Sequence, residues 1–300
     1  MTSQTESPII VLTTDFGASS PAVGVMKGVI LTINPRANIV DLTHRIDPQN
    51  VLQGARTLGG SHRYFPKQSI HVAVVDPGVG TNRQALLLTT PQGRFVAPDN
   101  GLLSIVIRDY LPDPPASSGP IAIPPGCSAR ALTQPRFWLH PVSNTFHGRD
   151  IFSPVAAHLS LGVPEQEVGP LVEQMIYLAA PQPSMASFEH GSEIRGEVVH
   201  ADHFGNLVTN ITAQDLGQAR SVTVEIKGRE IPRLSKTFHD ASPDAGGMLV
   251  ALISSSGYLE IAVPDGSAAQ YLGAESGETV TVRTNSAADS SNPSASIPDG

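Results

Sequence analysis

A carboxylate and a guanidinium lie seven residues apart in the sequence, directly after a run of apolar residues. The run 71–75 predicts a buried strand that ends at Asp76, after which Pro77-Gly78 turns the chain and Arg83 follows within reach of the acid. Two interpretations of this stretch remain open. The first is a carboxylate offered to a ligand at the carboxyl edge of an α/β sheet, and the second is a structural Asp–Arg pair within a loop.

Other polar positions fall at predicted strand ends or turns. They are Asp15, His147, Asp202 and the Ser-Ser-Ser-Gly run at 254–257. Each has a structural explanation when it is taken alone, such as a turn-forming Asp or a His near a helix start. Because they come from both halves of the chain, together they favour a cleft for a polar small molecule at a domain junction.

The sequence gives little support for a metal or a bound cofactor. His200, Asp202 and His203 are metal-binding residue types, but along a strand the two histidines point to opposite faces. The sequence has no HExxH motif, paired cysteines, Walker loop, GxGxxG after the first strand, or GxSxG elbow. We therefore expect no metal and no cofactor.

Composition narrows the class of protein. The 300 residues are 40% hydrophobic and 15% charged, which is typical of a soluble globular protein with few surface charges. The net charge of −8 argues against a nucleic-acid partner. No apolar run of membrane-spanning length and no signal sequence is evident, so we expect no membrane partner. Cys127 is the single cysteine, which excludes an internal disulfide, and we expect a cytoplasmic location.

The elements that must position these residues alternate between strand and helix up to residue 75. This β-α-β-α-β order predicts parallel strands. The predicted elements are strands 9–14, 39–42 and 69–75, a helix from Pro21 that Pro35 closes, a helix over 48–64, a hairpin over 85–97, a helix to Tyr110 capped by Asp99-Asn100-Gly101, and a helix over 151–161 with Asp150 as its N-cap. The Pro/Ser/Gly-rich residues 111–125 predict an excursion outside the core.

The pattern changes after a predicted linker at 181–189. Short β-rich runs separated by turns predict a small antiparallel sandwich or barrel. They cover residues 194–199, 207–211, 222–226, 249–253, 258–263 and 279–282. We expect an N-terminal α/β domain over 8–182, with a mostly parallel sheet flanked by helices, and a C-terminal all-β, barrel-like domain over 190–284. Residues 1–7 and 285–300 are expected to be disordered tails.

Six motifs occur in an order that is typical of one family. They are Thr14-Asp15-Phe16-Gly17, Val75-Asp76-Pro77-Gly78-Val79-Gly80, Pro98-Asp99-Asn100-Gly101-Leu102-Leu103, Thr145-Phe146-His147-Gly148-Arg149-Asp150, Asp202-His203-Phe204-Gly205-Asn206 and Ser255-Ser256-Gly257-Tyr258-Leu259. Through them, residues 8–284 resemble the S-adenosylmethionine hydrolase (hydroxide adenosyltransferase) family, which is related to the fluorinase and chlorinase enzymes. The resemblance implies an α/β domain, a β-barrel domain and a homotrimer with a small-molecule substrate between neighbouring subunits.

The resemblance also implies a reaction. Water attacks C5′ of S-adenosylmethionine and gives adenosine and L-methionine, with an Asp–Arg–His triad that corresponds to Asp76, Arg83 and His147. The sulfonium is already a good leaving group, so the chemical need is a base for water, which contributes about 10²–10⁴-fold. Arg83 can hold Asp76 in place and favour the developing hydroxide. The residue types do not decide whether Asp76 or His147 is the base.

For substrate binding, the resemblance implies contacts from both domains. Asp15 corresponds to the residue that binds the two ribose hydroxyls, and Asp202 to the one that binds the methionine ammonium. The remaining implied contacts are Phe204 and Asn206 near the adenine, Ser255 and Ser256 at the methionine carboxylate, and backbone from Val263 to Asp265 at the adenine edge.

The chain departs from the family pattern in places. Ser20 and Ala22 stand where members usually have an acid and an aromatic residue, and Ser256 stands where the halogenases have Arg. The fluorinase has Tyr in place of Asp76 and Tyr-Ser in place of His147-Gly148, so the triad favours water over halide as the nucleophile. Two alternatives remain: a halogenase that uses the same substrate, and a non-catalytic protein that binds adenosine or S-adenosylmethionine.

Overall fold

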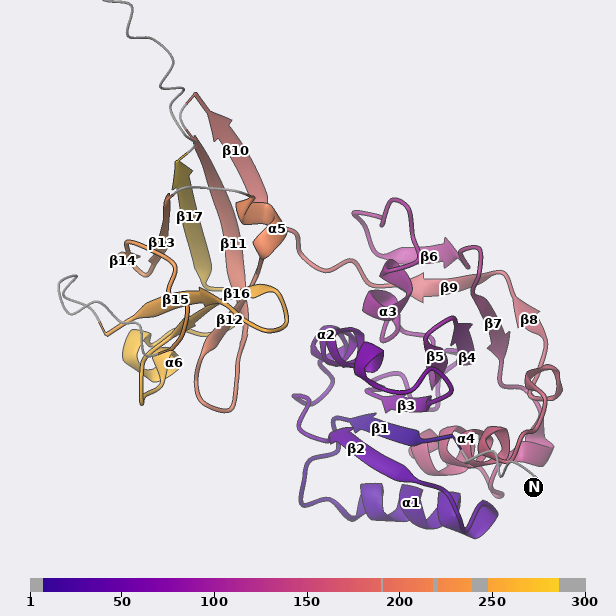
Figure 1. Ribbon diagram of the computed structural model, residues 1–300. Coiled ribbons are helices and arrows are strands. Elements are labelled where there is room, and N and C mark those ends of the chain that lie inside the picture. Colours follow the sequence, from indigo (N-terminus) through magenta and orange to yellow (C-terminus); the bar gives the residue numbers. More distant parts are fainter. Residues whose placement is uncertain (1–7, 190, 218–220, 239–247, 286–300) are drawn as a thin grey trace, which may run out of the picture. The chain divides into compact units, whose positions relative to one another are not determined.

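The computed structural model describes residues 8–189, 191–217, 221–238 and 248–285, which form two compact units with their boundary in the chain between Ala180 and Pro181 (Figure 1). Residues 1–7 and 286–300, most of the predicted tails, lie outside the described residues. Asn285, assigned to the tail by the sequence, is the last residue of a strand. Every helix that the structure describes is too short or too polar to cross a membrane.

The first unit is built on a seven-stranded mixed sheet in the order β2-β1-β3-β5-β4-β7-β8, with a separate β6-β9 pair. Its strands are β1 (Ile10–Thr14), β2 (Ile39–Thr43), β3 (Ile70–Val74), β4 (Ala85–Thr90), β5 (Gly93–Pro98), β6 (Gly119–Ala122), β7 (Ser128–Ala131), β8 (Leu171–Val172) and β9 (Gln174–Tyr177). The strands β2, β1 and β3 are parallel, as the alternating pattern predicts, and β5 also pairs parallel with β3. The later strands β4, β7 and β8 run antiparallel to their neighbours.

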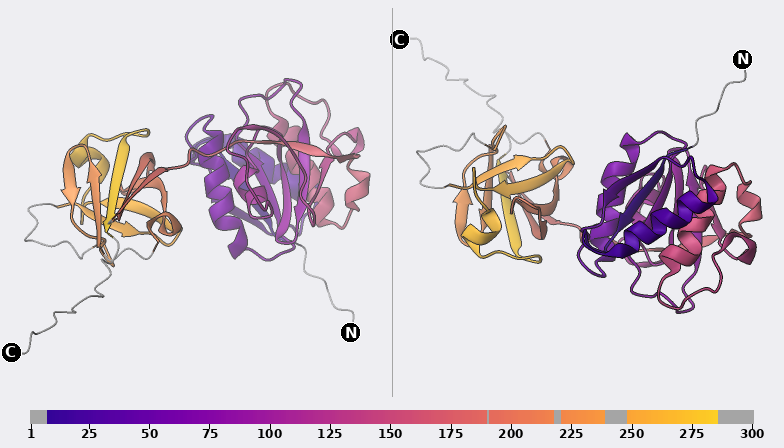
Figure 2. Two further views of the ribbon diagram at one scale, coloured as in Figure 1. Left: turned by 90° about the horizontal axis from the view of Figure 1, so that it is seen from above. Right: turned by 90° about the horizontal axis from the view of Figure 1, so that it is seen from below.

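Helices cover both faces of this sheet (Figure 2). They are α1 (Pro21–Ile33), α2 (Val51–Ser61), α3 (Ser104–Arg108), α4 (Ser153–Ser160), the π-helix η3 (Gly148–Phe152) and the 3₁₀ turns η1 (His62–Tyr64), η2 (Pro135–Phe137) and η4 (Glu165–Glu167). Side chains along β3 alternate between the two cores. Val72 and Val74 pack with α1 and α4, whereas Ala73 and Val75 pack with α2 and α3. A strand buried on both faces reads as a continuous apolar run, which is the pattern that preceded Asp76.

The second unit is an eight-stranded antiparallel sheet that curls into a nearly closed barrel (Figures 1 and 2). Its elements are β10 (Ser184–Phe188), β11 (Gly191–Ala201), β12 (Leu207–Thr212), α5 (Ala213–Leu216), β13 (Ser221–Ile226), β14 (Arg229–Ile231), β15 (Val250–Ile253), β16 (Tyr258–Ala262), α6 (Ala268–Leu272) and β17 (Thr279–Asn285). The long strand β11 pairs with β17 over residues 191–197 and with β12 over residues 198–201, where the β12 pairing contains a register shift between Val198 and His200. This bend lets one strand join both halves of the barrel.

Several local predictions are wrong because tertiary partners outweigh local composition. The predicted linker contains β10, which pairs with β11 through backbone hydrogen bonds although all five of its residues are exposed. The predicted excursion at 111–125 contains β6, and Ile121 within this strand and Ile123 just after it pack against the core.

Two predicted helix caps are also wrong. Asp150 lies inside η3 and is not an N-cap. Asp99 and Asn100 do not cap α3, which begins later at Ser104. They bond instead to backbone groups of Ile176 and Val75, respectively.

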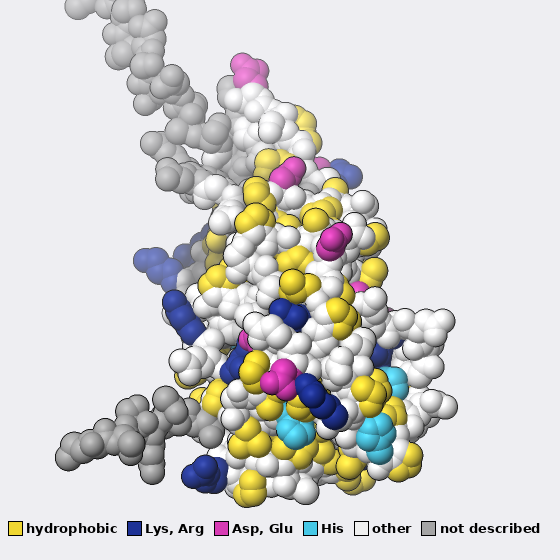
Figure 3. All heavy atoms as spheres, turned by 90° about the vertical axis from the view of Figure 1, so that its right-hand side faces the viewer, with side chains coloured by type: hydrophobic (Ala, Val, Ile, Leu, Met, Phe, Trp, Pro, Cys, Tyr) yellow, Lys and Arg dark blue, Asp and Glu magenta, His cyan; other side chains and the backbone are white. Residues whose placement is uncertain are grey.

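Charged side chains are sparse and of both signs on the face drawn in Figure 3. That distribution agrees with the low charged fraction of the sequence, and this face shows no continuous basic field of the kind that binds nucleic acid.

Candidate active site

The sheet brings two of the predicted acids to one edge. In the parallel pair β1–β3, Thr14 lies opposite Val74, so Asp15 and Asp76 both follow the carboxyl ends of neighbouring strands. Because the carboxyl ends of parallel strands form the ligand-binding edge of such sheets, this placement favours the ligand interpretation over a purely structural pair.

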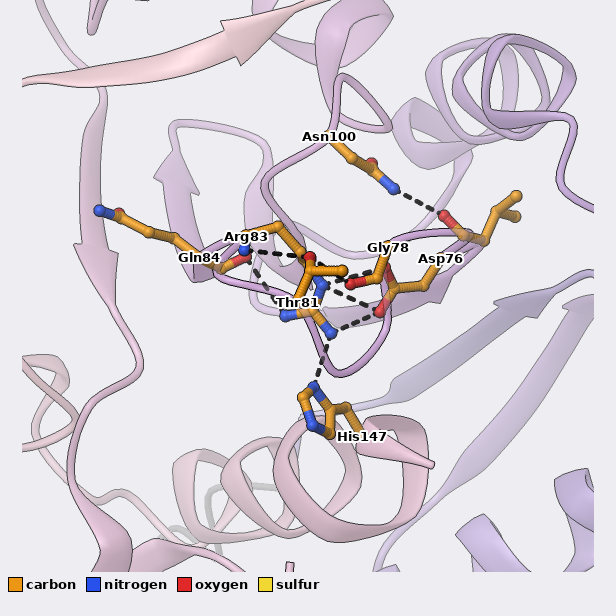
Figure 4. Close-up of polar contacts among 8 residues, drawn as sticks. Asp76, Gly78, Thr81, Arg83, Gln84, Asn100 and His147 are labelled. Carbon is orange, nitrogen blue, oxygen red and sulfur yellow. Dashed lines mark hydrogen bonds and ion pairs between the residues drawn. The ribbon is translucent and has the colours of Figure 1, made fainter. Parts of the chain in front are cut away.

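Arg83 holds the Asp76 carboxylate in a fork (Figure 4). Its Nε lies 2.9 Å from Oδ1 and 3.0 Å from Oδ2, and its Nη2 also donates to Oδ2. The side chains are only 10% (Arg83) and 4% (Asp76) exposed, and the guanidinium lies over the buried Phe152 ring at 5.4 Å from its centroid. A planar, charge-assisted pair of this kind fixes the orientation of both side chains.

The same guanidinium also reaches His147. Arg83 Nη2 lies 2.7 Å from His147 Nδ1, so the guanidinium stands between the carboxylate and the imidazole (Figure 4). Because a guanidinium only donates hydrogen bonds, Nδ1 must be the acceptor, and the neutral ring carries its proton on Nε2. Burial and the nearby charge of Arg83 lower the pKa of His147, although Asp76, Asp150 and a backbone contact with Ser143 act in the opposite direction. The imidazole is therefore neutral at neutral pH and presents an N–H donor.

Close backbone contact holds the two loops together. Gly80 has φ +77°, and a Cβ at this position would lie 2.3 Å from the Asn144 carbonyl oxygen. The segment before His147 is tied down by buried Asp150, which accepts hydrogen bonds from the Ser143 backbone and from Arg149. The turn at Gly80 thus allows Arg83 to reach a histidine that lies 64 residues further along the chain.

A cavity of about 340 Å³ lies beside this cluster. Its walls come from the ends of β1 and β3, the β2–α2 connection and the segment before η3; they are formed by Asp15, Phe16, Pro48, Gln49, Val74, Asp76, Pro77, Val79, Thr145, Phe146, His147 and Gly148. Phe16 and Phe146 meet edge to face with centroids 5.7 Å apart. The cavity thus combines apolar walls with the carboxylates of Asp15 and Asp76 and the imidazole of His147. Small-molecule sites commonly have such a lining.

Asp15 is held by backbone in this cavity. Its Oδ2 accepts a hydrogen bond of 2.8 Å from the Gln49 backbone N–H.

The departures from the family pattern in the following loop, Ser20 and Ala22, have a structural role. The Ser20 hydroxyl caps α1 by accepting from the Ala22 N–H, and Pro21 lies in the first turn of this helix.

In the second unit, Asp202 organises its own turn. It accepts hydrogen bonds from the backbone N–H groups of Phe204 and Asn206 and from the Asn206 side-chain amide. Gly205 has φ +84° and packs against Ser267 at the start of α6. Phe204 is 74% exposed, whereas Asn206 is buried.

Sequence reasoning missed Glu260, which lies near Asp202 at this end of the barrel. Burial raises the pKa of Glu260, and the negative charge of Asp202 adds to this, against a hydrogen bond with Ser254. The sequence signal for Glu260 is its position between the buried residues Leu259 and Ile261 on β16. Because side chains alternate along a strand, Glu260 points to the opposite face from these two residues.

The remaining predicted residues of the second unit lie on turns. Ser255 and Ser256 are exposed, and the Ser256 hydroxyl lies 2.8 Å from that of Ser254. Val263 is buried, and its carbonyl accepts from the Gly266 N–H. Within the described part of the chain, no group of three His, Cys, Asp or Glu side chains is placed to hold a metal ion.

Comparisons with known proteins cover nearly the whole chain. Residues 10–169 match the SAM hydroxide adenosyltransferase N-terminal domain, and residues 196–281 match the C-terminal domain of the same family. A protein of Salinispora arenicola named (R)-S-adenosyl-L-methionine hydrolase is 37% identical, over 92% of this chain and 98% of its own length. One of the same name from Thermus thermophilus is 37% identical, over 89% of this chain and 96% of its own.

A more distant relative and a solved structure also match this chain over most of its length. A fluorinase of an Actinoplanes species is 30% identical over 92% of this chain and 97% of its own. A crystal structure of an uncharacterised protein from Thermotoga maritima superposes with a TM-score of 0.77 and 35% identity, over 91% of this chain and 99% of that one. The two-unit fold is therefore shared over the full length of these proteins.

Proposed function

Because the chain belongs to the SAM hydroxide adenosyltransferase family, we propose that it hydrolyses S-adenosyl-L-methionine at C5′ to adenosine and L-methionine. The observation that carries this proposal is the Arg83 guanidinium, bonded to both Asp76 and His147 at the wall of a cavity that also holds Asp15. The relatives at 37% identity named (R)-S-adenosyl-L-methionine hydrolase support the same reaction.

In this mechanism, Asp76 accepts the proton of the attacking water. The oxygen of the water forms a bond to C5′, the C5′–S bond breaks, and methionine leaves as a neutral thioether with the electron pair on sulfur. His147 is poorly suited to be the base, because its Nδ1 lone pair is bonded to Arg83 and its Nε2 carries the proton. Its Nε2–H instead orients the water by donating to the water oxygen. General-base assistance of this kind contributes about 10²–10⁴-fold.

Arg83 bonds to both Asp76 and His147 and thereby supports the roles proposed for each. Its fork fixes the orientation of the Asp76 carboxylate, and its positive charge favours the hydroxide character that develops on the water. Because the sulfonium needs no protonation to leave, the site requires no general acid opposite the water.

For binding, we propose that Asp15 accepts hydrogen bonds from the two ribose hydroxyls, and that the second unit supplies Asp202, Phe204, Asn206, Ser255, Ser256 and backbone from Val263. Asp202 already accepts three hydrogen bonds from its own turn. We therefore add Glu260 as a second carboxylate for the methionine ammonium. Its raised pKa, which reflects burial and the like charge of Asp202, fits a site that is completed by a cation.

The proposal includes the assembly. The catalytic cluster lies within residues 8–182, the proposed methionine and adenine contacts lie within 190–284, and a cytoplasmic homotrimer would form each site from two neighbouring subunits. Light scattering should then give about three times the chain mass of 31.5 kDa. Mixing Asp76→Ala chains with Glu260→Gln chains should restore activity above that of either variant alone, if the two residues act in one site across an interface.

Product analysis tests the reaction itself. Incubation with each sulfonium epimer of S-adenosyl-L-methionine should give adenosine and methionine, and oxygen-18 from labelled water should appear in the 5′-hydroxyl group of adenosine. Asp76→Ala, Arg83→Ala and His147→Ala should each lower kcat/KM by at least about 100-fold. Formation of 5′-chloro-5′-deoxyadenosine in the presence of chloride would indicate a halogenase, and binding without turnover would indicate a sensor.

A further inference from the structure

The connection between β2 and α2, residues 44–50, holds Asp15 from two sides. Gln49 donates its backbone N–H to Asp15 Oδ2 at 2.8 Å. His44 holds the turn that carries Asp15: its carbonyl accepts from the Gly17 N–H at 2.8 Å, and its Nδ1 lies 2.9 Å from the Thr14 hydroxyl. The residue before Asp15 and the second residue after it are thus both bonded to His44.

The bond to Thr14 belongs to a chain of polar contacts. His44 Nε2 lies 3.1 Å from Asp41 Oδ1, and Asp41 Oδ2 lies 2.6 Å from Lys27 Nζ on α1. The contact between Nε2 and Asp41 is a close polar contact without hydrogen-bond geometry, whereas the Thr14 hydroxyl and His44 Nδ1 form one hydrogen bond. The Thr14 oxygen in turn accepts from the Phe16 N–H at 3.3 Å. The order Thr–His–Asp resembles a hydrolase triad, but Thr14 is fully buried, so no substrate can reach its hydroxyl.

Gln49 has an unusual backbone for its role. Its φ is +65°, a conformation that side chains other than glycine adopt infrequently, and it lies in the wall of the cavity. Such outliers occur where the surrounding structure requires them, often at ligand sites. Here the left-handed turn aims the N–H at Asp15, and Oδ1 accepts no hydrogen bond from the described residues.

We propose that His44 and Gln49 are positioning residues that set the Asp15 carboxylate to recognise a vicinal diol, and thereby make the site selective for a ribonucleoside over its 2′-deoxy form. This inference rests on the proposed function, which assigns Asp15 to the ribose. Oδ2 is fixed by backbone and keeps one lone pair, and within the described ranges Oδ1 accepts no hydrogen bond. A carboxylate fixed in this way can accept from both hydroxyls of a diol, and removal of one hydroxyl leaves a charged acceptor unpaired.

Calorimetric titration with adenosine and with 2′-deoxyadenosine tests the inference without depending on turnover. The wild-type chain should bind adenosine at least about tenfold more tightly, as expected for a lost hydrogen bond to a charged group. Thr14→Val removes the hydroxyl that bonds to His44, and Gln49→Pro removes the N–H and cannot adopt a positive φ. Both variants should lower the preference to about threefold or less.

Each variant has a matched control. Thr13→Val changes the neighbouring buried threonine, whose hydroxyl has no hydrogen-bond partner among the described residues, and should keep the wild-type preference. Gln49→Gly retains the N–H and favours the positive φ, so it should also keep the preference. General loosening of the fold would weaken both nucleosides equally and leave their ratio unchanged.

The outcomes separate the two proposals. If the wild type prefers adenosine and both Thr14→Val and Gln49→Pro retain that preference, the positioning role is wrong and the proposed function stands. If Gln49→Pro does not fold, Thr14→Val decides alone, because valine matches threonine in shape and the variant is expected to fold. A wild-type chain that binds adenosine and 2′-deoxyadenosine equally, or binds neither, contradicts the assignment of Asp15 to the ribose and with it this inference, whereas the hydrolysis itself is decided separately by product analysis.

Discussion

Replacing His71 should remove much of the acid sensitivity of the first unit. His71 lies on β3 with no exposed surface, stacked on Phe95 with centroids 4.9 Å apart, and neither ring nitrogen has a hydrogen-bond partner among the described residues. Burial and, secondarily, the charge of nearby His62 lower the pKa of His71 from 6.5 to about 3. The imidazole is therefore neutral in the folded chain at every pH above about 3.

The sign and the size of the effect follow from proton linkage. The unfolded chain binds a proton at His71 as the pH falls below 6.5 and the folded chain does not, so stability is lost on acidification. At pH 5, about 1.5 units below the unfolded pKa and at about 1.4 kcal/mol per unit, the loss is about 2 kcal/mol. Most of the contribution is intact at pH 7.5.

The assay is urea unfolding at about pH 7.5 and pH 5, followed by fluorescence. Trp138 is the single tryptophan and packs against the core of the first unit, so its emission reports that unit. Between pH 7.5 and pH 5, the free energy of unfolding should fall by about 2 kcal/mol more in the wild type than in His71→Leu. Val72→Ala on the same strand should lower stability equally at both. A constant difference between wild type and His71→Leu would refute the reasoning.

Three further predictions concern the site. Gly80→Ala should lower the free energy of unfolding by about 2 kcal/mol or more and reduce activity, because its Cβ would lie 2.3 Å from the Asn144 carbonyl oxygen. Gly28→Ala, whose Cβ would lie in open space on α1, is the control and should leave the free energy of unfolding unchanged or raise it. Urea unfolding measures both. Arg83→Lys should cost at least about 100-fold in kcat/KM without a matching loss of thermal stability, because one ammonium cannot bond the carboxylate in a fork and also reach the histidine; activity within threefold of wild type would contradict this. Glu260→Gln should raise KM for the sulfonium substrate about tenfold, whereas the affinity for adenosine, measured by calorimetry, should stay unchanged. An equal loss of affinity for both ligands would contradict a contact between Glu260 and the methionine ammonium.

The sequence was sufficient for the three parallel strands β1, β2 and β3, because their signals are local. Runs such as 70–74 are buried on both faces, and helices with spaced apolar residues connect the strands, so β-α-β-α-β and the shared edge of Asp15 and Asp76 follow from pattern alone. In the second unit, alternation and turns predicted the strands β11, β12, β13, β15, β16 and β17, but not β10 or β14.

What the sequence could not supply depends on partners far away in the chain. The backbone of β10 pairs with β11 although its side chains are all exposed, so no burial pattern indicates a strand. Asn100 was predicted to help cap a helix, but its amide bonds to the carbonyl of Val75, the residue before Asp76. A capping side chain and a cross-strand brace have the same local sequence, and only the position of the neighbouring strand distinguishes them.

The choice between Asp76 and His147 as the base illustrates the same limit in chemical terms. Both residue types can accept a proton near neutral pH in a suitable environment, so their identity leaves the question open. The structure adds the direction of one hydrogen bond: Arg83 donates to Nδ1, which fixes the tautomer and removes that lone pair from use. That contact exists because Gly80 lets its loop approach Asn144 closely enough for the guanidinium to reach across. The proposed roles of Asp76 as acceptor and His147 as donor for one water therefore depend on the close backbone approach at Gly80, and a larger residue there should disturb them without a change in any of the three side chains.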